Sequence, residues 1–379
     1  MQIIDNLNID FIKNRKIAYI VSSVLLILGI GSLVLRGLEL GIDFKGGSEI
    51  TLEFENPIDI TDIREDLSNI GIGNVEVKTF GGEQGVLVRT ELQNIPPEIF
   101  PRIVASITNF IDASFEGIQY SVTDSSRDHV TLRLPDPETA KNVSAKLLRH
   151  GFQSSLASQE ANNVDLVVRV TISDWIQETL REKHADNKFS VSSETLVGPK
   201  IGDELKFDAI ISILLALLVI LIYIGFRFKF AFAVGAVAAL FHDVIITLGI
   251  FSLLYDVIPG LNLEISVSIV AAFLTLIGYS INDSVVVFDR VRENLKIHKT
   301  AALEQNINRG INLTIRRTLV TSLTTLFVVT ILLFFGGEVL RGFAFTMFFG
   351  IIIGTYSSIF VASNFVYEYA MKSKKKIQF

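Results

Sequence analysis

The 379-residue sequence contains no cysteine, and none of its five histidines has the HExxH spacing of a zinc hydrolase. Without cysteine the chain can form no disulfide bond, thiolate nucleophile or cysteine-based zinc site, so any part outside a membrane must fold on its own apolar core. A nucleotide-binding loop is also absent, because the glycine pair Gly46 and Gly47 lacks the Gly-Lys-Ser or Gly-Lys-Thr of a Walker motif. We therefore expect no enzymatic activity, no cofactor and no metal, and any work must draw on an ion gradient or a partner protein.

Long apolar runs dominate what the sequence does contain. Apolar residues make up 49% of the chain, 28 residues are phenylalanine, and the mean hydropathy is +0.46. A run of roughly 20 apolar residues is needed to cross a bilayer. Six runs meet this length, at 17–35, 208–226, 231–254, 265–288, 318–336 and 343–369. This pattern is typical of a polytopic α-helical membrane protein with six transmembrane helices.

Basic residues lie at every second connection between these runs. By the positive-inside rule both termini are expected in the cytoplasm, and the segment between the first two runs on the outer side. That segment, from Arg36 to Lys206, has a net charge of about −11, which leaves about +5 for the rest of the chain. The first run is followed by no A-x-A-like cleavage site, so we interpret it as a retained anchor.

These features divide the chain into four parts. Residues 1–36 form the cytoplasmic N-terminus and the first span, 37–206 an extracytoplasmic domain, 207–370 spans two to six, and 371–379 a basic cytoplasmic tail with Lys374, Lys375 and Lys376.

The extracytoplasmic domain is expected to be α+β, with ferredoxin-like layers. Residues 49–55 alternate like a half-buried strand, and residues 61–70 carry apolar positions at helical spacing. Strand patterns follow at 75–80 and 86–90, with glycines between them. This first set of elements forms a small layer.

A second set of elements occupies about 95–186. We expect a helix after Pro96, strands near 118–123 and 129–134, a helix near 137–150, a strand near 164–170 and a helix around Trp175. The two sets match in element order but not in sequence. An internal duplication therefore remains open.

Asp243 is an ionisable residue inside the third apolar run. It lies about midway between Lys229 and Asp256, and a helix rise of roughly 1.5 Å per residue places it near the middle of the membrane. Ionisable groups at this depth are costly and usually functional, so Asp243 is a candidate for loading and releasing a proton. The structural alternative is a permanently protonated aspartic acid that only holds helices together. His242 is a second candidate, although adjacent residues on a helix point in different directions.

Asp283 lies in the cytoplasmic third of the fourth run, next to Asn282. Arg290 is seven residues further on, on the same helix face but about 10 Å along the axis, so it cannot pair directly with Asp283. We select Asp283 and Asn282 as proton-coupling candidates. Arg290 either takes part or is a topology anchor that extends to the membrane surface.

Four threonines on the fifth run recur at intervals of four, three and four residues: Thr314, Thr318, Thr321 and Thr325. Such a stripe on one helix face bonds a neighbouring helix or lines a polar path for protons. We retain both interpretations, with Thr318, Thr321 and Thr325 as the residues of the path.

Several motifs match a known family in their order along the chain. The most specific is residues 277–294, with the sequence IGYSINDSVVVFDRVREN. Others are GIDFKGG at 41–47, His-Asp-Val at 242–244, RTLVTS at 317–322 and Phe-Gly-Gly at 335–337. On these residues the chain resembles the SecF family, the smaller membrane subunit of the SecDF protein-export complex in the resistance-nodulation-division superfamily.

The resemblance implies a subunit of the bacterial cytoplasmic (inner) membrane that works with SecD, the SecYEG channel and, indirectly, the SecA motor. It implies that the proton motive force promotes export of polypeptides, with membrane lipids but no nucleic acid among the partners. The proton-coupling carboxylate of the family falls on Asp243, and a polar belt on Asn282, Asp283 and Arg290.

The family motif after the first span falls on four residues, Gly41, Asp43, Gly46 and Gly47. The extracytoplasmic segment of about 170 residues is longer than the resemblance leads us to expect. We locate the additional residues, an insertion, at about 92–185.

Two other functions remain open. The chain could be a half-transporter of the same superfamily that exports small molecules, although those transporters usually carry two sets of six spans and two external loops. It could also be a scaffold that stabilises SecYEG without coupling to protons.

Overall fold

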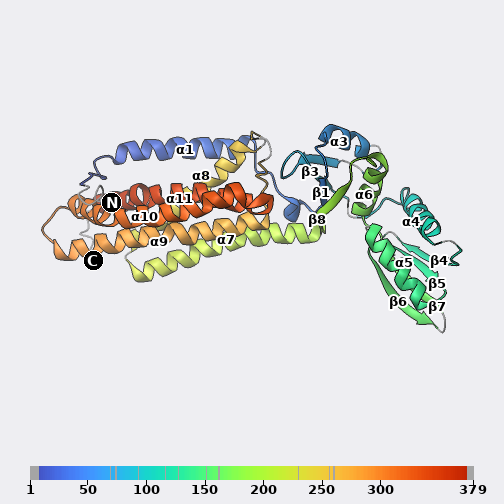
Figure 1. Cartoon of the computed structure of the whole chain (residues 1–379). Helices are drawn as coiled ribbons and strands as arrows, with labels where there is room; N and C mark the ends of the chain where they lie inside the picture. The colour runs from blue at the N-terminus through green and yellow to red at the C-terminus, as the bar shows by residue number, and fades with distance from the viewer. Residues whose placement is uncertain are drawn as a thin grey trace. The chain divides into compact units, whose positions relative to one another are not determined.

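The computed structural model describes residues 8–373 except 69, 73–74, 93, 116, 127, 151, 161–162, 229, 256 and 259–260. The chain divides into two compact units. One contains the described residues up to Gly41 and from Glu204 onward, and the other runs from Ile42 to Asp203 (Figure 1). The basic tail predicted around Lys374, Lys375 and Lys376 lies outside the described residues, as do Lys229 and Asp256.

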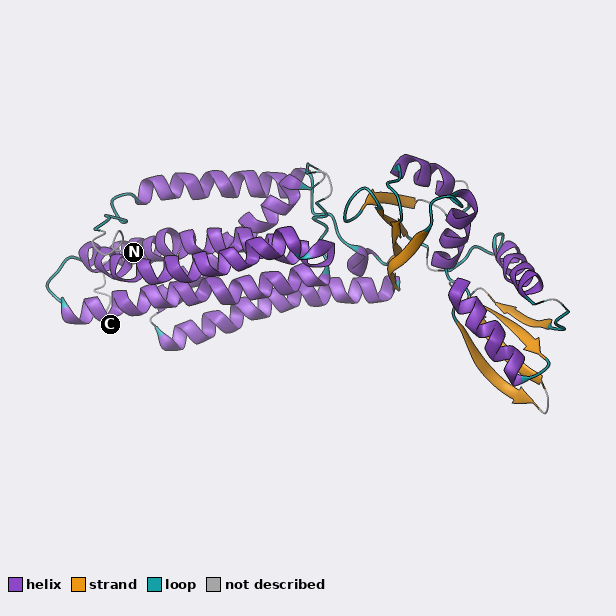
Figure 2. Ribbon diagram, in the orientation of Figure 1, coloured by secondary structure: helices purple, strands orange, loops and turns teal. Residues whose placement is uncertain are grey.

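Six helices in the described part of the chain are long and apolar enough to cross a membrane, which confirms the six predicted spans. Five are single helices: α1 (Arg15–Leu35), α7 (Pro199–Arg227), α8 (Phe230–Leu254), α9 (Val267–Ile297) and α10 (Leu303–Phe335). The sixth consists of α11 (Gly337–Ser357), a π-helical turn η2 (Ser358–Ala362) and α12 (Ser363–Ser373). Figure 2 shows these helices in purple.

Helix α8 is enclosed by its neighbours because its sequence is rich in small residues. It packs against α1, α9, α11 and η2. Ala233, Ala236 and Ala239 are buried, and small side chains let helix backbones approach closely. Helices α1 and α8 cross at Gly29 and Gly249, where a Cβ added to Gly249 would overlap the backbone of Gly29. The middle of the bundle is therefore built around α8, the helix that carries Asp243.

The unit from Ile42 to Asp203, called the outer unit after its predicted position, contains a ferredoxin-like βαββαβ layer, as predicted. Its elements are β1 (Gly47–Phe54), α3 (Ile60–Ser68), β2 (Val75–Thr79), β3 (Gly85–Thr90), α6 (Ile172–Lys183) and β8 (Phe189–Val197). The antiparallel sheet has the order β2-β3-β1-β8. Helices α3 and α6 pack together, and the alternating residues Ile50, Leu52 and Phe54 of β1 belong to the apolar core.

A second sheet is inserted between β3 and α6. Its elements are α4 (Phe100–Ser114), β4 (Ser121–Ser126), β5 (His129–Leu134), α5 (Pro137–His150), β6 (Ser154–Glu160) and β7 (Asn163–Arg169). The order is β4-β5-β7-β6 (Figure 2). If β7, the last strand of the second set, corresponds to β1, the first strand of the first set, then β4, β5 and β6 correspond to β2, β3 and β8. The two sheets then have the same strand order, so the second set repeats the first as a circular permutation. The two sets therefore match in element order only after this permutation, and not directly as expected from the sequence.

The structure corrects two details of the predicted second set. The helix around Trp175, α6, packs on the first sheet, where the indole Nε1 donates to the carbonyl of Ile70 at 3.3 Å, so the insertion ends before Ile172 and not near residue 185. Strand β6 was not predicted. Its sequence SSLASQE has a single large apolar residue, and only its pairing with β7 makes it a strand.

The start of α6 has a titratable capping group. Thr171 and Asp174 form a capping box, in which Asp174 Oδ2 accepts from the Thr171 backbone at 2.7 Å and the Asp174 backbone donates to Thr171 Oγ1 at 3.2 Å. Burial raises the pKa of Asp174 from 3.8 to about 7, although the hydrogen bonds from Thr171 favour the charged form. Glu194 adds to the rise in pKa.

The raised pKa of Asp174 predicts that the outer unit is more stable in mild acid. The folded chain retains a proton that the unfolded chain releases, so this contribution is complete below about pH 4 and is lost as the pH rises to about 7. Trp175, the only tryptophan, reports unfolding in the intact chain. We expect the urea midpoint of its fluorescence to fall between pH 5 and pH 8, and Asp174→Asn to reduce that difference. A control variant at the exposed Asp186, Asp186→Asn, should leave it unchanged.

A buried aspartate and histidine among the membrane helices

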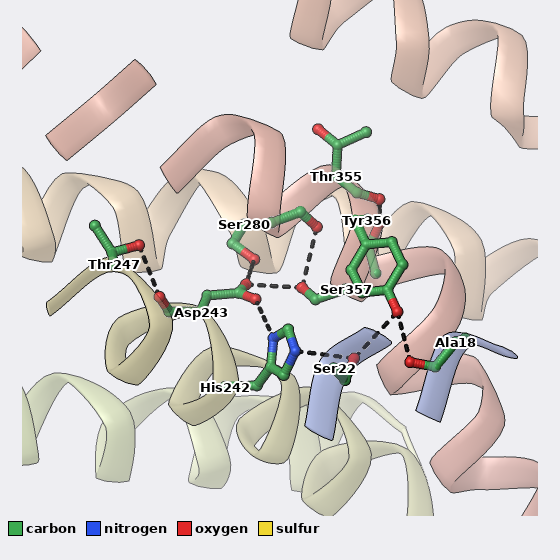
Figure 3. Close-up of polar contacts among 11 residues, drawn as sticks. Ala18, Ser22, His242, Asp243, Thr247, Ser280, Thr355, Tyr356 and Ser357 are labelled. Carbon is green, nitrogen blue, oxygen red and sulfur yellow. Dashed lines mark hydrogen bonds and ion pairs between the residues drawn. The ribbon is translucent and has the colours of Figure 1, made fainter. Parts of the chain in front are cut away.

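The candidate site is centred on the carboxyl group of Asp243, which is 1% exposed. Both of its oxygens have partners from other side chains (Figure 3). Oδ1 contacts His242 Nδ1 at 3.0 Å, and Oδ2 accepts from Ser280 Oγ at 2.7 Å and from Ser357 Oγ at 2.8 Å. These partners come from α8, α9 and α11, so three helices meet at one carboxyl group.

His242 extends this network to a fourth helix. Its Nε2 contacts Ser22 Oγ of α1 at 3.1 Å, and Ser22 Oγ contacts the hydroxyl of Tyr356 at 3.1 Å. That hydroxyl donates to the carbonyl oxygen of Ala18 at 2.8 Å (Figure 3). His242 is 5% exposed, and its ring stacks on Tyr356 with 6.2 Å between centroids. A continuous chain of hydrogen bonds therefore joins Asp243 to the backbone of α1.

His242 and Asp243 contact each other although adjacent helical residues diverge at Cβ. The imidazole lies between two partners, with Nδ1 in contact with the carboxyl group of Asp243 and Nε2 in contact with Ser22 of α1 (Figure 3). His242 and Asp243 were predicted from the sequence. Their partners Ser22, Ser280, Tyr356 and Ser357 were not, because a serine or tyrosine in an apolar run gives no sign of its partner.

The π-helical turn η2 begins directly after Ser357. At its end the hydroxyl of Ser363, the first residue of α12, donates to the carbonyl of Ser358 at 3.2 Å. The turn packs on α8, where a Cβ added to Gly235 would lie 3.2 Å from the carbonyl oxygen of Ala362. Single π turns in helices are frequent at functional sites, and this one adjoins the residues that contact Asp243 and Ser22. No pattern in the sequence predicts it.

Asp283 belongs to a second buried cluster on α9, one turn from Ser280. It is 4% exposed, and its Oδ2 accepts from Ser322 Oγ of α10 at 3.3 Å. Thr355 of α11 donates to Ser322 at 2.7 Å. The two carboxyl groups thus have separate hydrogen-bond partners, and both clusters involve α9 and α11.

The other predicted coupling residues lie apart from these two carboxyl groups. The side chain of Arg290 forms an ion pair with Glu293 at 2.5 Å. Asn282 is exposed on the surface of the bundle, although it is adjacent to the buried Asp283.

The threonines of α10 do not all share one environment. Thr314 and Thr318 are buried, Thr325 is half-buried and accepts from the Tyr279 hydroxyl at 3.3 Å, and Thr321 is exposed. Thr321 also donates to carbonyl oxygens of its own helix. Thr318 Oγ1 is buried without a hydrogen-bond partner among the described residues.

The motif at residues 41–47 shapes the backbone between α1 and the outer sheet. The backbone N–H of Gly41 donates to the carbonyl of Ile265 at 2.8 Å, and Asp43 lies in the short helix α2 (Ile42–Lys45). Gly46 and Gly47 have φ of 75° and 122°, values that favour glycine. Across the described residues, no group of three or more histidine, aspartate or glutamate side chains is placed to hold a metal ion.

Two family models match the chain. Residues 176–372 match the C-terminal part of the protein export membrane proteins SecD/SecF, and residues 31–58 match the SecD/SecF GG motif.

Similar curated proteins are named protein translocase subunit SecF. The protein from Rhodothermus marinus is 42% identical over 368 residues, which cover 97% of this chain and 95% of the relative. The protein from Calditerrivibrio nitroreducens is 36% identical over 371 residues, with 97% and 96% covered. The protein from Pseudomonas aeruginosa is 32% identical over 355 residues, with 94% and 89% covered.

Two solved structures are similar in fold. The crystal structure of SecDF from Thermus thermophilus, a translocon-associated membrane protein, matches with a TM-score of 0.65 and 30% identity over 98% of this chain. A SecDF structure in the super-membrane-facing form matches with a TM-score of 0.56, 29% identity and 97% of this chain. In both cases the match covers 40% of the SecDF chain, so this chain corresponds to less than half of that protein.

Proposed function

Because the chain belongs to the SecD/SecF protein-export family, and within it to the SecF translocase subunits, we propose that it works with SecD to promote polypeptide export with the proton motive force. It is a multi-pass bacterial membrane protein. In this proposal it lies in the cytoplasmic membrane, acts beside SecYEG and SecA, and needs neither an enzymatic step nor a cofactor.

The observation that carries the proposal is the buried contact between Asp243 and His242. A charge in this position is far from water, so gain or loss of a proton changes the energy of the hydrogen bonds from Ser280, Ser357 and Ser22. A proton that crosses a potential of 100 mV contributes about 2.3 kcal/mol, which biases a two-state equilibrium roughly 50-fold. This is sufficient to drive a change in helix packing.

The N-terminal segment supports the proposed cytoplasmic position of the amino terminus. The backbone N–H groups of Ile9 and Ile12 donate to Asn312 and Asn308 of α10, at 3.0 and 3.1 Å. These asparagines lie at the end of α10 that follows the basic α9–α10 connection, the connection expected on the cytoplasmic side.

Polar side chains on the outer surface of the bundle support a partner with its own membrane helices. Thr275 and Asn282 of α9 are exposed, and so are Thr321 and Thr324 of α10, which packs beside α9. On α7, by contrast, the exposed residues from Leu214 to Ile222 are apolar. The three threonine hydroxyls donate to carbonyl oxygens of their own helices, whereas an amide that faces lipid is unfavourable. On the position of Asn282, helices of SecD are proposed to cover the surface of α9 and α10.

Removing polar groups from this surface is expected to weaken the association with SecD. An interhelical hydrogen bond in a membrane contributes about 1 kcal/mol, so Asn282→Leu should lower the recovery of SecD in mild detergent about fivefold. Leu218→Ala, on the exposed surface of α7, is the control and should leave recovery unchanged. Equal recovery of SecD with both variants would exclude this surface as the interface.

The proposed function is tested by translocation of a preprotein into inverted membrane vesicles. Vesicles that contain the chain should export faster when a proton gradient is imposed, and a protonophore should remove the difference. If the chain is a scaffold for SecYEG, export will depend on its presence but not on the gradient. If it is a small-molecule exporter, its deletion will change drug accumulation and leave preprotein export intact.

A further inference from the structure

We propose that the hydrogen-bond chain from Asp243 through His242, Ser22 and Tyr356 to Ala18 reverses direction when the site loses its proton, and thereby releases a contact on α1 (Figure 3). This inference rests on the proposed proton coupling. It adds Ser22 and Tyr356 as the residues that transmit the proton state of the site to α1.

In the proton-loaded state, the direction in which each hydrogen bond of this series is donated follows from its last acceptor, the carbonyl oxygen of Ala18. A carbonyl oxygen can only accept, so the Tyr356 hydroxyl uses its single proton on Ala18. The hydroxyl of Ser22 must then donate to the Tyr356 oxygen, because two acceptors cannot pair. Ser22 has no second proton, and His242 Nε2 must therefore donate to it.

The other end of the chain then contains one proton. Oδ2 of Asp243 accepts from both Ser280 and Ser357, so the contact of 3.0 Å between Oδ1 and His242 Nδ1 needs a proton of its own. The proton lies on the carboxyl group with a neutral imidazole, or on the imidazole with a carboxylate. Either arrangement gives every atom in the chain a partner.

Loss of this proton leaves two acceptors face to face, carboxylate Oδ1 and the lone pair of Nδ1. The contact is restored if the imidazole proton moves from Nε2 to Nδ1, the other neutral tautomer. Nε2 then accepts from Ser22, and Ser22 accepts in turn from Tyr356. The Tyr356 hydroxyl has only one proton, so its bond to Ala18 is broken.

The charged side chains nearest to this hydrogen-bond chain bond to other partners. Asp283, the nearest buried carboxyl group along α9, bonds to Ser322. At the start of α1, Arg15 pairs with Glu368 at 3.1 Å. The elements packed around His242 and Asp243 contribute hydroxyl groups to the contacts described above: Ser22 from α1, Ser280 from α9, and Tyr356 and Ser357 from α11.

The released contact lies on α1, the helix that precedes the outer unit in the sequence. Most side chains of α1 are exposed, and its buried residues are Ala18, Ser22, Gly29 and Ser32. Among the described residues, the side chains of α1 bond to the rest of the bundle at three positions: Arg15 with Glu368, Ser22 with His242 and Tyr356, and Ser32 with Ser252 at 2.8 Å. Breaking the bond between Tyr356 and Ala18 therefore loosens a helix with a small number of polar contacts.

The tautomer of His242 tests the proposal directly. With isotopically labelled histidine, nitrogen chemical shifts in the intact chain distinguish a proton on Nε2 from one on Nδ1, and five histidines allow assignment by substitution. We expect Nε2 to be protonated before the site is deprotonated, in the neutral or the doubly protonated imidazole, and only Nδ1 to be protonated afterwards. A His242 that keeps the Nε2–H form throughout the titration overturns the proposal.

Export in inverted vesicles separates this inference from the proposed function. Ser22→Ala and Tyr356→Phe should lower the gradient-dependent part of export roughly tenfold, in the range of typical coupling energies. The controls Ser23→Ala and Tyr223→Phe, at exposed positions on α1 and α7, should not. If Asp243→Asn removes gradient dependence while Ser22→Ala and Tyr356→Phe behave as the controls, the inference fails and the proposed function stands. If Asp243→Asn keeps the gradient dependence, Asp243 is not the coupling group and the inference fails with it. The proposed function itself fails if export with the unmodified chain does not depend on the gradient.

Discussion

Asp243→Asn is expected to remove the gradient-dependent part of preprotein export, a loss of at least about tenfold, while ATP-driven export continues. Asparagine has nearly the same shape and still accepts from Ser280 and Ser357, but it cannot take up or release a proton. The variant should therefore insert and fold normally. The measurement is the export rate into inverted vesicles with and without a protonophore.

Substitution of two other carboxyl groups on α9 shows whether the effect is specific to Asp243. Asp289→Asn is the control, because Asp289 is exposed and only pairs with Arg227 at 3.5 Å. Asp283→Asn asks whether the second buried carboxyl group, bonded to Ser322, takes part. If Asp243→Asn keeps its gradient dependence and Asp283→Asn loses it, the coupling group is Asp283 and the Asp243 cluster is structural.

Gly47→Ala is expected to destabilise the outer unit by about 3 kcal/mol, the sum of two effects. Gly47 has φ of 122°, which is unfavourable for a residue with a Cβ. The added Cβ would also overlap the carbonyl oxygen of Thr90 and lie 3.1 Å from Cα of Glu91. Because β1 pairs with β3 on this side, neither strand can move without loss of backbone hydrogen bonds. Urea unfolding followed by Trp175 fluorescence measures the change.

Gly82→Ala is the matched control for this substitution. Gly82 has a similar φ of 138°, but no heavy atom lies within 4 Å of the position of its Cβ. It should therefore lose only the conformational part, about 1–2 kcal/mol. If the two variants are equally stable, the overlap with Thr90 is relieved by a small shift and does not explain the glycine at position 47.

The outer unit illustrates why some elements were predictable and others were not. In β1 the apolar residues Ile50, Leu52 and Phe54 alternate with polar ones and are buried, so a single strand pattern predicts the element and its core face, although Thr51 on the other face is buried as well. Strand β6 has almost no such pattern, because an edge strand needs few apolar residues. The assignment of α6 to the first sheet depends on contacts with α3 and β1, which no local periodicity contains.

The candidate site shows the same limit at the level of single residues. Asp243 was recognisable because a carboxyl group in an apolar run is costly wherever the helices lie. The residues linked to it were not, since Ser22 is 220 residues from His242 and Tyr356 lies on α11, with α9 and α10 between it and α8. Arg290 and Asp283 share a helix face as predicted, yet neighbouring side chains occupy their bonding groups, Glu293 for one and Ser322 for the other.

By itself, the sequence determined six membrane spans, a ferredoxin-like outer layer, a buried carboxyl group in the third span and membership of a protein-export family. These follow from the energy of apolar and charged groups in a bilayer, from local periodicity and from motifs, all of which are local in the chain. The tertiary structure alone decided that Asp243 and His242 are linked through Ser22 and Tyr356 to α1, and that a π turn lies beside them. Hydrogen bonds between distant segments depend on how helices pack, and packing depends on the shape of the whole bundle.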